Sequence, residues 1–185
     1  MRKILLSLIL VCAFAIQFSY QQINFNPQRT TTGPFGVASG TSFEFNRGSD
    51  KFNMLPKTMT VSHGTRGITS ISVTYYPQAG PVTETGGIQS RAITETEIGY
   101  YGRIVRAEVC TGITSESTII TGLKFFYENG MMNYYHGNDE IVLNFECVDA
   151  TPTTPGYYLH YFSGSYETYI NQLTLYWVSN FEQEK

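Results

Sequence analysis

The chain has 185 residues, enough for one domain with its own hydrophobic core. It carries 15 acidic and 12 basic residues, and the Lys and Arg residues form no cluster along the chain. Nucleic acid and anionic membrane surfaces are therefore not expected as partners, because both attract proteins through concentrated positive charge.

The first segment has the features of a signal peptide. Two basic residues precede an apolar run from Ile4 to Ile16, which is 13 residues long. This run is too short to cross a bilayer and has the length of a signal-peptide core. Ala13-Phe14-Ala15 matches the small-residue pattern of cleavage sites, so cleavage is expected after Ala15 or near Tyr20. We expect a signal peptide over 1–20, an N-terminal extension over 21–32, and a secreted protein with no integral membrane segment in its mature form.

The remaining chain has the composition of an all-β domain. Aromatic residues make up 15% of the sequence, and long stretches with helical periodicity are missing. Three segments share an alternation of apolar and polar residues, and their first residues lie 52 and 50 positions apart: Ile68–Tyr75, Ile120–Tyr127 and Ile170–Trp177. Each follows a shorter strand that ends in glycine. A strand, a glycine-containing loop and a second strand form a hairpin, so three similar hairpins around one core are expected.

The alternation also assigns one face of each long strand to the core. The residues expected to point inward are Ile71, Val73, Tyr75, Leu123, Phe125, Tyr127, Leu173, Leu175 and Trp177. An ordinary two-sheet sandwich, whose strands merely look alike, is the alternative.

Three cysteines are present, and Cys12 leaves with the signal peptide. Cys110 and Cys147 then remain as a single pair. In an oxidising compartment they can form a disulfide, and the alternative is two buried free thiols.

Four stretches follow one another in the order known from one family. They are GPFGVASGTSFEF (33–45), MTVSHGTRGITSISVTYY (59–76), YYGRIVRAEVCTG followed by STIITGLKFFYENGMMNYYHG (100–137), and YYLHYFSGSYETYINQLTLYWV (157–178). In this order they resemble the jacalin-related lectins, including the animal secretory-granule members. The resemblance implies an all-β fold over 33–180, a β-prism I of three four-stranded Greek-key sheets with pseudo-threefold symmetry.

The resemblance further implies sugar binding without a metal or another cofactor. In the family, a hexose, often mannose or galactose, lies between a glycine of the opening loop and a G-x-x-x-D loop. Carried over residue by residue, that glycine is Gly40 and the second loop is Glu167-Thr168-Tyr169-Ile170-Asn171. Thr168 and Tyr169 would offer backbone N–H groups, and Asn171 its side-chain amide.

The chain departs from the family at both ends of this loop. Glu167 stands where glycine is usual, and Asn171 stands where aspartate is usual. A carboxylate accepts through both oxygens, whereas an amide has one acceptor and one donor group. We therefore expect a weakened or redirected sugar contact. Gly86-Gly87 could build a second site, with a plain turn as the alternative.

Signals for other chemistry are weak. The three histidines, His63, His136 and His160, show no metal-binding spacing, and no nucleophile elbow or phosphate-binding loop is found. We therefore do not expect an enzyme. The sequence predicts a secreted lectin with glycans or glycoproteins as partners, and it allows a homo-oligomer. The alternative is a secretory-granule matrix or protein-interaction module that keeps the fold and has lost the sugar pocket.

Overall fold

The computed structural model describes residues 28–45, 56–75, 80–91, 94–98, 103–115, 117–136 and 143–179. The expected signal peptide over 1–20 lies outside these ranges. The first strand begins at Arg29, within the segment 21–32 that was expected to be an extension. None of the described ranges contains a helix long and apolar enough to cross a membrane.

The described residues form strands connected by loops and one short 3-10 helix, Gln89–Arg91. The strands are β1 (Arg29–Gly36), β2 (Thr41–Glu44), β3 (Pro56–His63), β4 (Ile68–Tyr75), β5 (Val82–Gly87), β6 (Thr94–Ile98), β7 (Ile104–Ile113), β8 (Thr118–Tyr127), β9 (Met132–His136), β10 (Leu143–Asp149), β11 (Tyr157–Tyr166) and β12 (Ile170–Ser179).

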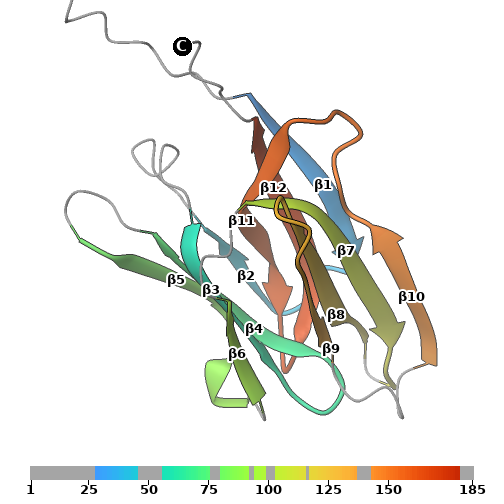
Figure 1. The fold of residues 1–185 in the computed structure, drawn as a ribbon. Coiled ribbons are helices and arrows are strands. Elements are labelled where there is room, and N and C mark those ends of the chain that lie inside the picture. Colours follow the sequence, from blue (N-terminus) through green and yellow to red (C-terminus); the bar gives the residue numbers. More distant parts are fainter. Residues whose placement is uncertain are drawn as a thin grey trace, which may run out of the picture.

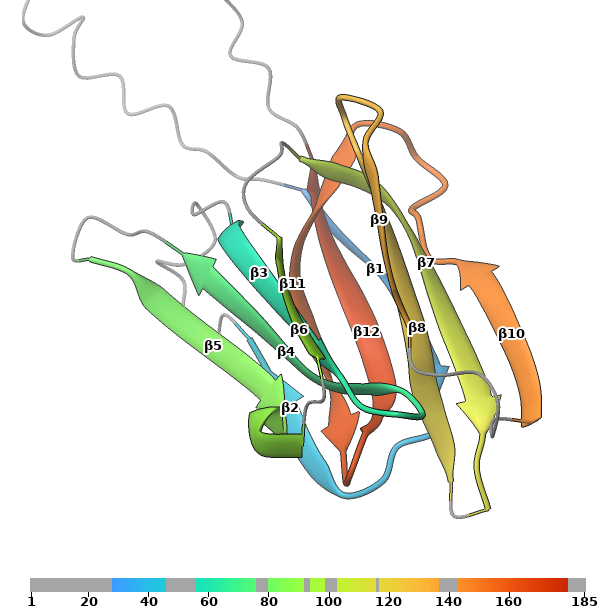
Figure 2. The same cartoon turned by 60° about the horizontal axis from the view of Figure 1, so that its bottom comes forward.

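The strands form three four-stranded sheets, with the orders β1-β12-β11-β2 (sheet 1), β10-β7-β8-β9 (sheet 2) and β5-β4-β3-β6 (sheet 3). Figures 1 and 2 show the three sheets leaning against one another. Each sheet is built on one central antiparallel hairpin, β11–β12, β7–β8 or β3–β4. These are the three hairpins that the sequence repeat predicts. The Greek-key order of each sheet confirms the β-prism, and the two-sheet sandwich is wrong.

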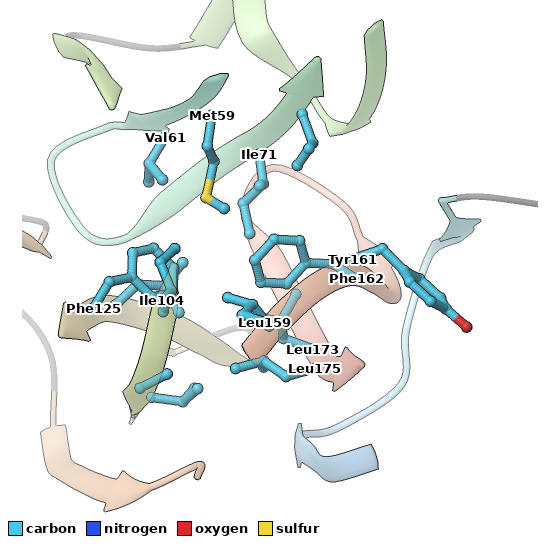
Figure 3. Packing of buried hydrophobic residues seen from close by; sticks show 14 of the residues in the cluster. Met59, Val61, Ile71, Ile104, Phe125, Leu159, Tyr161, Phe162, Leu173 and Leu175 are labelled. Atoms are coloured by element: carbon cyan, nitrogen blue, oxygen red, sulfur yellow. The ribbon is translucent and has the colours of Figure 1, made fainter. Parts of the chain in front are cut away.

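The inward faces meet in one apolar core. All nine residues expected to point inward are buried, with at most 4% of their surface exposed. Figure 3 shows side chains from all three sheets meeting there, among them Met59, Phe125 and Leu173. The Phe162 ring on sheet 1 packs against Phe45, with ring centroids 6.2 Å apart, and against Phe125 on sheet 2, at 6.4 Å. The sequence prediction of the core is therefore confirmed.

A partly buried chain of hydrogen bonds ties sheet 1 to the segment after β10. The indole Nε1–H of Trp177 donates to the hydroxyl of Thr32 at 2.9 Å, and that hydroxyl donates to the carbonyl of Ala150 at 2.6 Å. The indole N–H and the Thr32 hydroxyl therefore each have an acceptor, which avoids the cost of an unpaired polar group at these two positions.

A disulfide joins β10, an edge strand of sheet 2, to its neighbour β7. Cys110 on β7 lies directly opposite Cys147 on β10, and the two sulfur atoms are bonded. The disulfide prediction is confirmed, and the alternative of two free thiols is wrong.

We predict that Phe162→Ala lowers the free energy of unfolding by about 3 to 5 kcal/mol, because it opens a cavity between two sheets. Denaturant unfolding measures this loss. Phe145→Ala is the matched control, since Phe145 is 43% exposed on β10, and it should cost about 1 kcal/mol or less. Equal losses for the two variants would contradict the shared core.

We predict that reducing the Cys110–Cys147 bond destabilises the fold by about 4 kcal/mol on the chain-entropy estimate, because the bond closes a loop between residues 37 positions apart. Unfolding with and without a thiol reductant measures the difference. A Cys110→Ser/Cys147→Ser double variant should show no response to the reductant. A wild-type protein that is equally insensitive would count against the bond.

Candidate functional site

The loops after β3, β7 and β11 lie at the same end of the prism, at the bottom of Figure 1. We call this the loop end. The loops after β3 and β7 are each closed by a backbone hydrogen bond of 2.9 Å. Gly64 N–H donates to the carbonyl of Gly67, and Thr114 N–H donates to the carbonyl of Ser117. In the third, Glu167 N–H donates to the carbonyl of Tyr169 at 3.0 Å. The three repeated hairpins therefore place their connecting loops at the same end of the molecule.

Gly40 lies against the loop that the family resemblance singles out. Strand β2 pairs with β11 so that Thr41 lies opposite Tyr166. Gly40 has φ +71°, and a Cβ placed on it would collide with the carbonyl oxygen of Tyr166 and lie 2.5 Å from Cγ of Glu167. Only glycine fits this approach and this backbone conformation.

Two further backbone contacts hold the opening loop, residues 37–40, in place. Val37 N–H donates to the carbonyl of Asn171 at 3.1 Å, and Ser39 N–H donates to the hydroxyl of Ser165 at 3.1 Å. The two expected site segments, more than a hundred residues apart in sequence, are therefore side by side.

Asn171 lies beneath this surface rather than on it, with 1% of its area exposed. Its Oδ1 accepts the N–H of Glu167 at 2.9 Å. Its Nδ2 donates to the hydroxyl of Ser117 at 2.9 Å and to the carbonyl of Thr118 at 3.0 Å. Both amide hydrogens are thus used within the protein. In this conformation the amide is bonded within the protein and holds the loop.

The outer part of the loop is accessible. Glu167 is exposed, and Thr168 and Tyr169 are half-buried. The hydroxyl of Tyr169 lies 3.5 Å from that of Thr65 in the loop after β3. Sequence reasoning missed Thr65 and Ser117. The repeat was the available signal, because equivalent hairpins place their loops at the same end.

Gly87 makes a contact in sheet 3 that corresponds to the one Gly36 makes in sheet 1. Each has a positive φ, +99° and +81°, and a Cβ on either would collide with a backbone carbonyl, that of Thr69 or Asn171. The next residue then donates to the same carbonyl, as Ile88 does to Thr69 at 2.8 Å. Close backbone approach therefore accounts for Gly87 without a ligand.

A cavity of about 450 Å³ lies at the opposite end of the prism, between the start of β7 and the segment 151–158. One charged residue of its wall, Arg106, is paired with two carboxylates. Arg106 donates to Glu108 at 2.8 Å and to Asp149 at 3.2 Å, and its guanidinium lies over the Phe126 ring. Burial alone would raise the pKa of Asp149, but hydrogen bonds from Thr151 and Arg106 outweigh it and hold that pKa below its usual value.

Among the three histidines, His160 packs inside the molecule. His160 is buried, and its ring lies 6.0 Å from that of Tyr75, whose hydroxyl donates to the His160 carbonyl at 3.1 Å. Burial, and then the charge of Glu84, raises the pKa of Tyr75, so this hydroxyl stays a donor. Within the described residues, no group of three or more His, Cys, Asp or Glu side chains could hold a metal ion.

The three four-stranded Greek-key sheets define a β-prism protein. A family model for the jacalin-like lectin domain matches residues 32–176. The chain belongs to this family.

Solved structures with the same fold have low sequence identity to the chain. The Calsepa lectin in complex with a biantennary N-glycan has a TM-score of 0.65 and 15% identity, covering 84% of this chain and 99% of its own. AcmJRL, a mannose-binding jacalin-related lectin from Ananas comosus, has a TM-score of 0.64 and 12% identity, and the match covers 82% of this chain and 98% of AcmJRL. The artocarpin–mannotriose complex has a TM-score of 0.60 and 16% identity, and the match covers 81% of this chain and 97% of artocarpin. No curated protein matches the chain in sequence.

We predict that Gly40→Ala costs more stability than Gly130→Ala. Both glycines have a positive φ, +71° and +83°, but nothing lies within 4 Å of a Cβ on Gly130. Gly130→Ala should therefore cost only the backbone strain, about 1 to 2 kcal/mol, and Gly40→Ala about 1 kcal/mol or more beyond that. Denaturant unfolding of the two variants gives the difference. Equal costs would mean that the opening loop does not pack on Tyr166.

Proposed function

We propose that the protein is a non-catalytic lectin that binds mannose- or galactose-type glycans at the loop end. The observation that carries the proposal is the contact of Gly40 with the accessible 167–169 loop. It joins the two segments that the family uses for a hexose. The relatives named above include one described as mannose-binding and others bound to an N-glycan and to mannotriose.

The chemistry of the loop end suits a shallow sugar site. Glu167 supplies an exposed carboxylate, and Thr168 and Tyr169 supply backbone N–H groups and a half-buried ring. Sugar hydroxyls donate to carboxylates and accept from N–H groups, and apolar sugar faces stack on aromatic rings. Loops held by a rigid β framework are a common place for such sites.

The proposal includes secretion, to the extracellular space or a secretory granule. Two features support it. The apolar run from Ile4 to Ile16 has the length of a signal-peptide core, and the Cys110–Cys147 disulfide is of the kind that persists in oxidising compartments.

A granule matrix or protein-interaction module is the second candidate. The position of Asn171 favours it, because the amide at the family's aspartate position is buried and bonded within the protein. A prism whose sugar contacts have been lost would still present the rigid loop end to a partner.

A glycan array with the purified protein separates the two candidates. We expect binding to mannose- or galactose-terminated glycans. Tyr169→Ala should weaken it about tenfold or more, equivalent to ~1.4 kcal/mol of lost contact. Tyr134→Ala is the matched control, because Tyr134 is exposed on β9 in another part of the molecule, and it should leave binding unchanged.

Absence of binding to every glycan at high protein concentration, together with self-assembly, would favour the matrix module. Cleavage of a glycoside substrate would overturn the non-catalytic assignment.

A further inference from the structure

The side chain at position 171 must both accept and donate hydrogen bonds. The N–H of Glu167 can only donate, and the carbonyl of Thr118 can only accept. The asparagine amide meets both needs, and its second hydrogen goes to Ser117. An ionised aspartate has acceptors alone, so one of its oxygens would face the Thr118 carbonyl oxygen in a site that is 1% exposed.

This amide links two sheets. Asn171 is on β12 of sheet 1, while Ser117 immediately precedes β8 of sheet 2 and Thr118 is its first residue. The bonded residues are 54 and 53 positions apart in sequence. Since the same amide also holds the N–H of Glu167, it sets the position of the loop relative to the neighbouring hairpin.

Glu167 occupies the space above Gly40. A Cβ on residue 40 would lie 2.5 Å from Cγ of Glu167, so the side-chain stem passes over the glycine. The residue is exposed, and no hydrogen bond or ion pair engages its carboxylate within the described part of the chain. The Glu167 carboxylate is therefore an exposed side-chain acceptor next to Gly40, where the family resemblance places the sugar.

We propose that Asn171 is a positioning residue that clamps the loop to sheet 2, and that Glu167 carries the carboxylate that accepts the hydroxyls of a neutral hexose. This inference rests on the proposed lectin function. Two adjacent hydroxyl donors match the two carboxylate oxygens. Sialylated, uronic-acid and sulfated glycans are disfavoured, because their negative charge would meet that of Glu167.

The clamp is tested by the pH dependence of Asn171→Asp stability. Burial raises the pKa of the introduced carboxyl. Its proton can donate to Thr118 as the native amide does, so the variant should approach wild-type stability below the ordinary carboxyl pKa and lose that stability as pH rises from there through the raised pKa. At pH 7 the melting temperature should fall by about 3 °C or more.

Several variants isolate the effect. Asn129→Asp is the matched control, because Asn129 is exposed and its Oδ1 accepts the Met131 N–H, and it should change stability little at any pH. Asn171→Asp should be repeated in a Glu167→Gln background, which leaves the introduced carboxyl as the only one in the 167–171 loop. If Asn171→Asp does not fold at neutral pH, Ser117→Ala should still lower the melting temperature, since it deletes one of the two acceptors. A pH-independent deficit for Asn171→Asp, or wild-type stability at pH 7, would overturn the clamp.

The acceptor is tested with neutral and anionic glycans. Glu167→Gln should weaken binding of neutral mannose- or galactose-terminated glycans about tenfold or more while leaving the melting temperature unchanged, and it should narrow the discrimination against sialylated and sulfated glycans. Glu128→Gln removes an exposed carboxylate from the cavity at the opposite end and should have neither effect.

The outcomes separate this inference from the proposed function. Unchanged neutral binding by Glu167→Gln, with glycan binding by the wild type, would overturn the role of Glu167 alone. Stronger glycan binding by Asn171→Asp would show that position 171 faces the sugar after all. No glycan binding by the wild type would overturn the lectin function and the Glu167 role together, while the stability measurements would still decide the clamp.

Discussion

The structure depends on one constraint: each of the three sheets has an apolar inner face that it can bury only against the other two. Phe162 illustrates this, because its ring contacts Phe45, which directly follows β2 of its own sheet, and Phe125 of sheet 2. Removing any sheet would expose the inner faces of the remaining two to water, at a cost that scales with the apolar area. The shared core therefore fixes the relative positions of the three hairpins and, through them, of the loops at one end.

The loop end inherits its geometry from this packing. The opening loop reaches the 167–171 segment because β2 pairs with β11, and Gly40 permits the close approach. The loop after β7 lies beside the 167–171 segment because sheets 1 and 2 share the core. There the Asn171 amide donates a hydrogen bond to Ser117 of that loop. Backbone fit and a single buried amide thus place the polar groups that a ligand would meet.

Membership of the family fixes the fold of this protein but not the chemistry of its candidate site. A prism with TM-scores of 0.60 to 0.65 to known lectins is retained at identities of 12 to 16%, since many apolar sequences can fill the same core. Site chemistry depends on a few side chains and is free to change on a constant fold. The two departures, Glu167 and Asn171, are coupled in this structure, because the backbone of one is bonded to the side chain of the other.

The sequence by itself determined the three hairpins, the inward-facing rows and the all-β class, because alternation is a local property of extended backbone and recurs in each copy. Through the resemblance it also predicted Gly40 and the 167–171 loop as site segments, which stays a prediction. It left the pairing of Cys110 and Cys147 open and gave Asn171 a surface role. Only the tertiary structure showed that the two cysteines face each other across β7 and β10, and that the Asn171 amide turns inward to Ser117 and Thr118. These contacts join residues tens of positions apart, and they arise from how strands and sheets pack, which no local pattern of residues records.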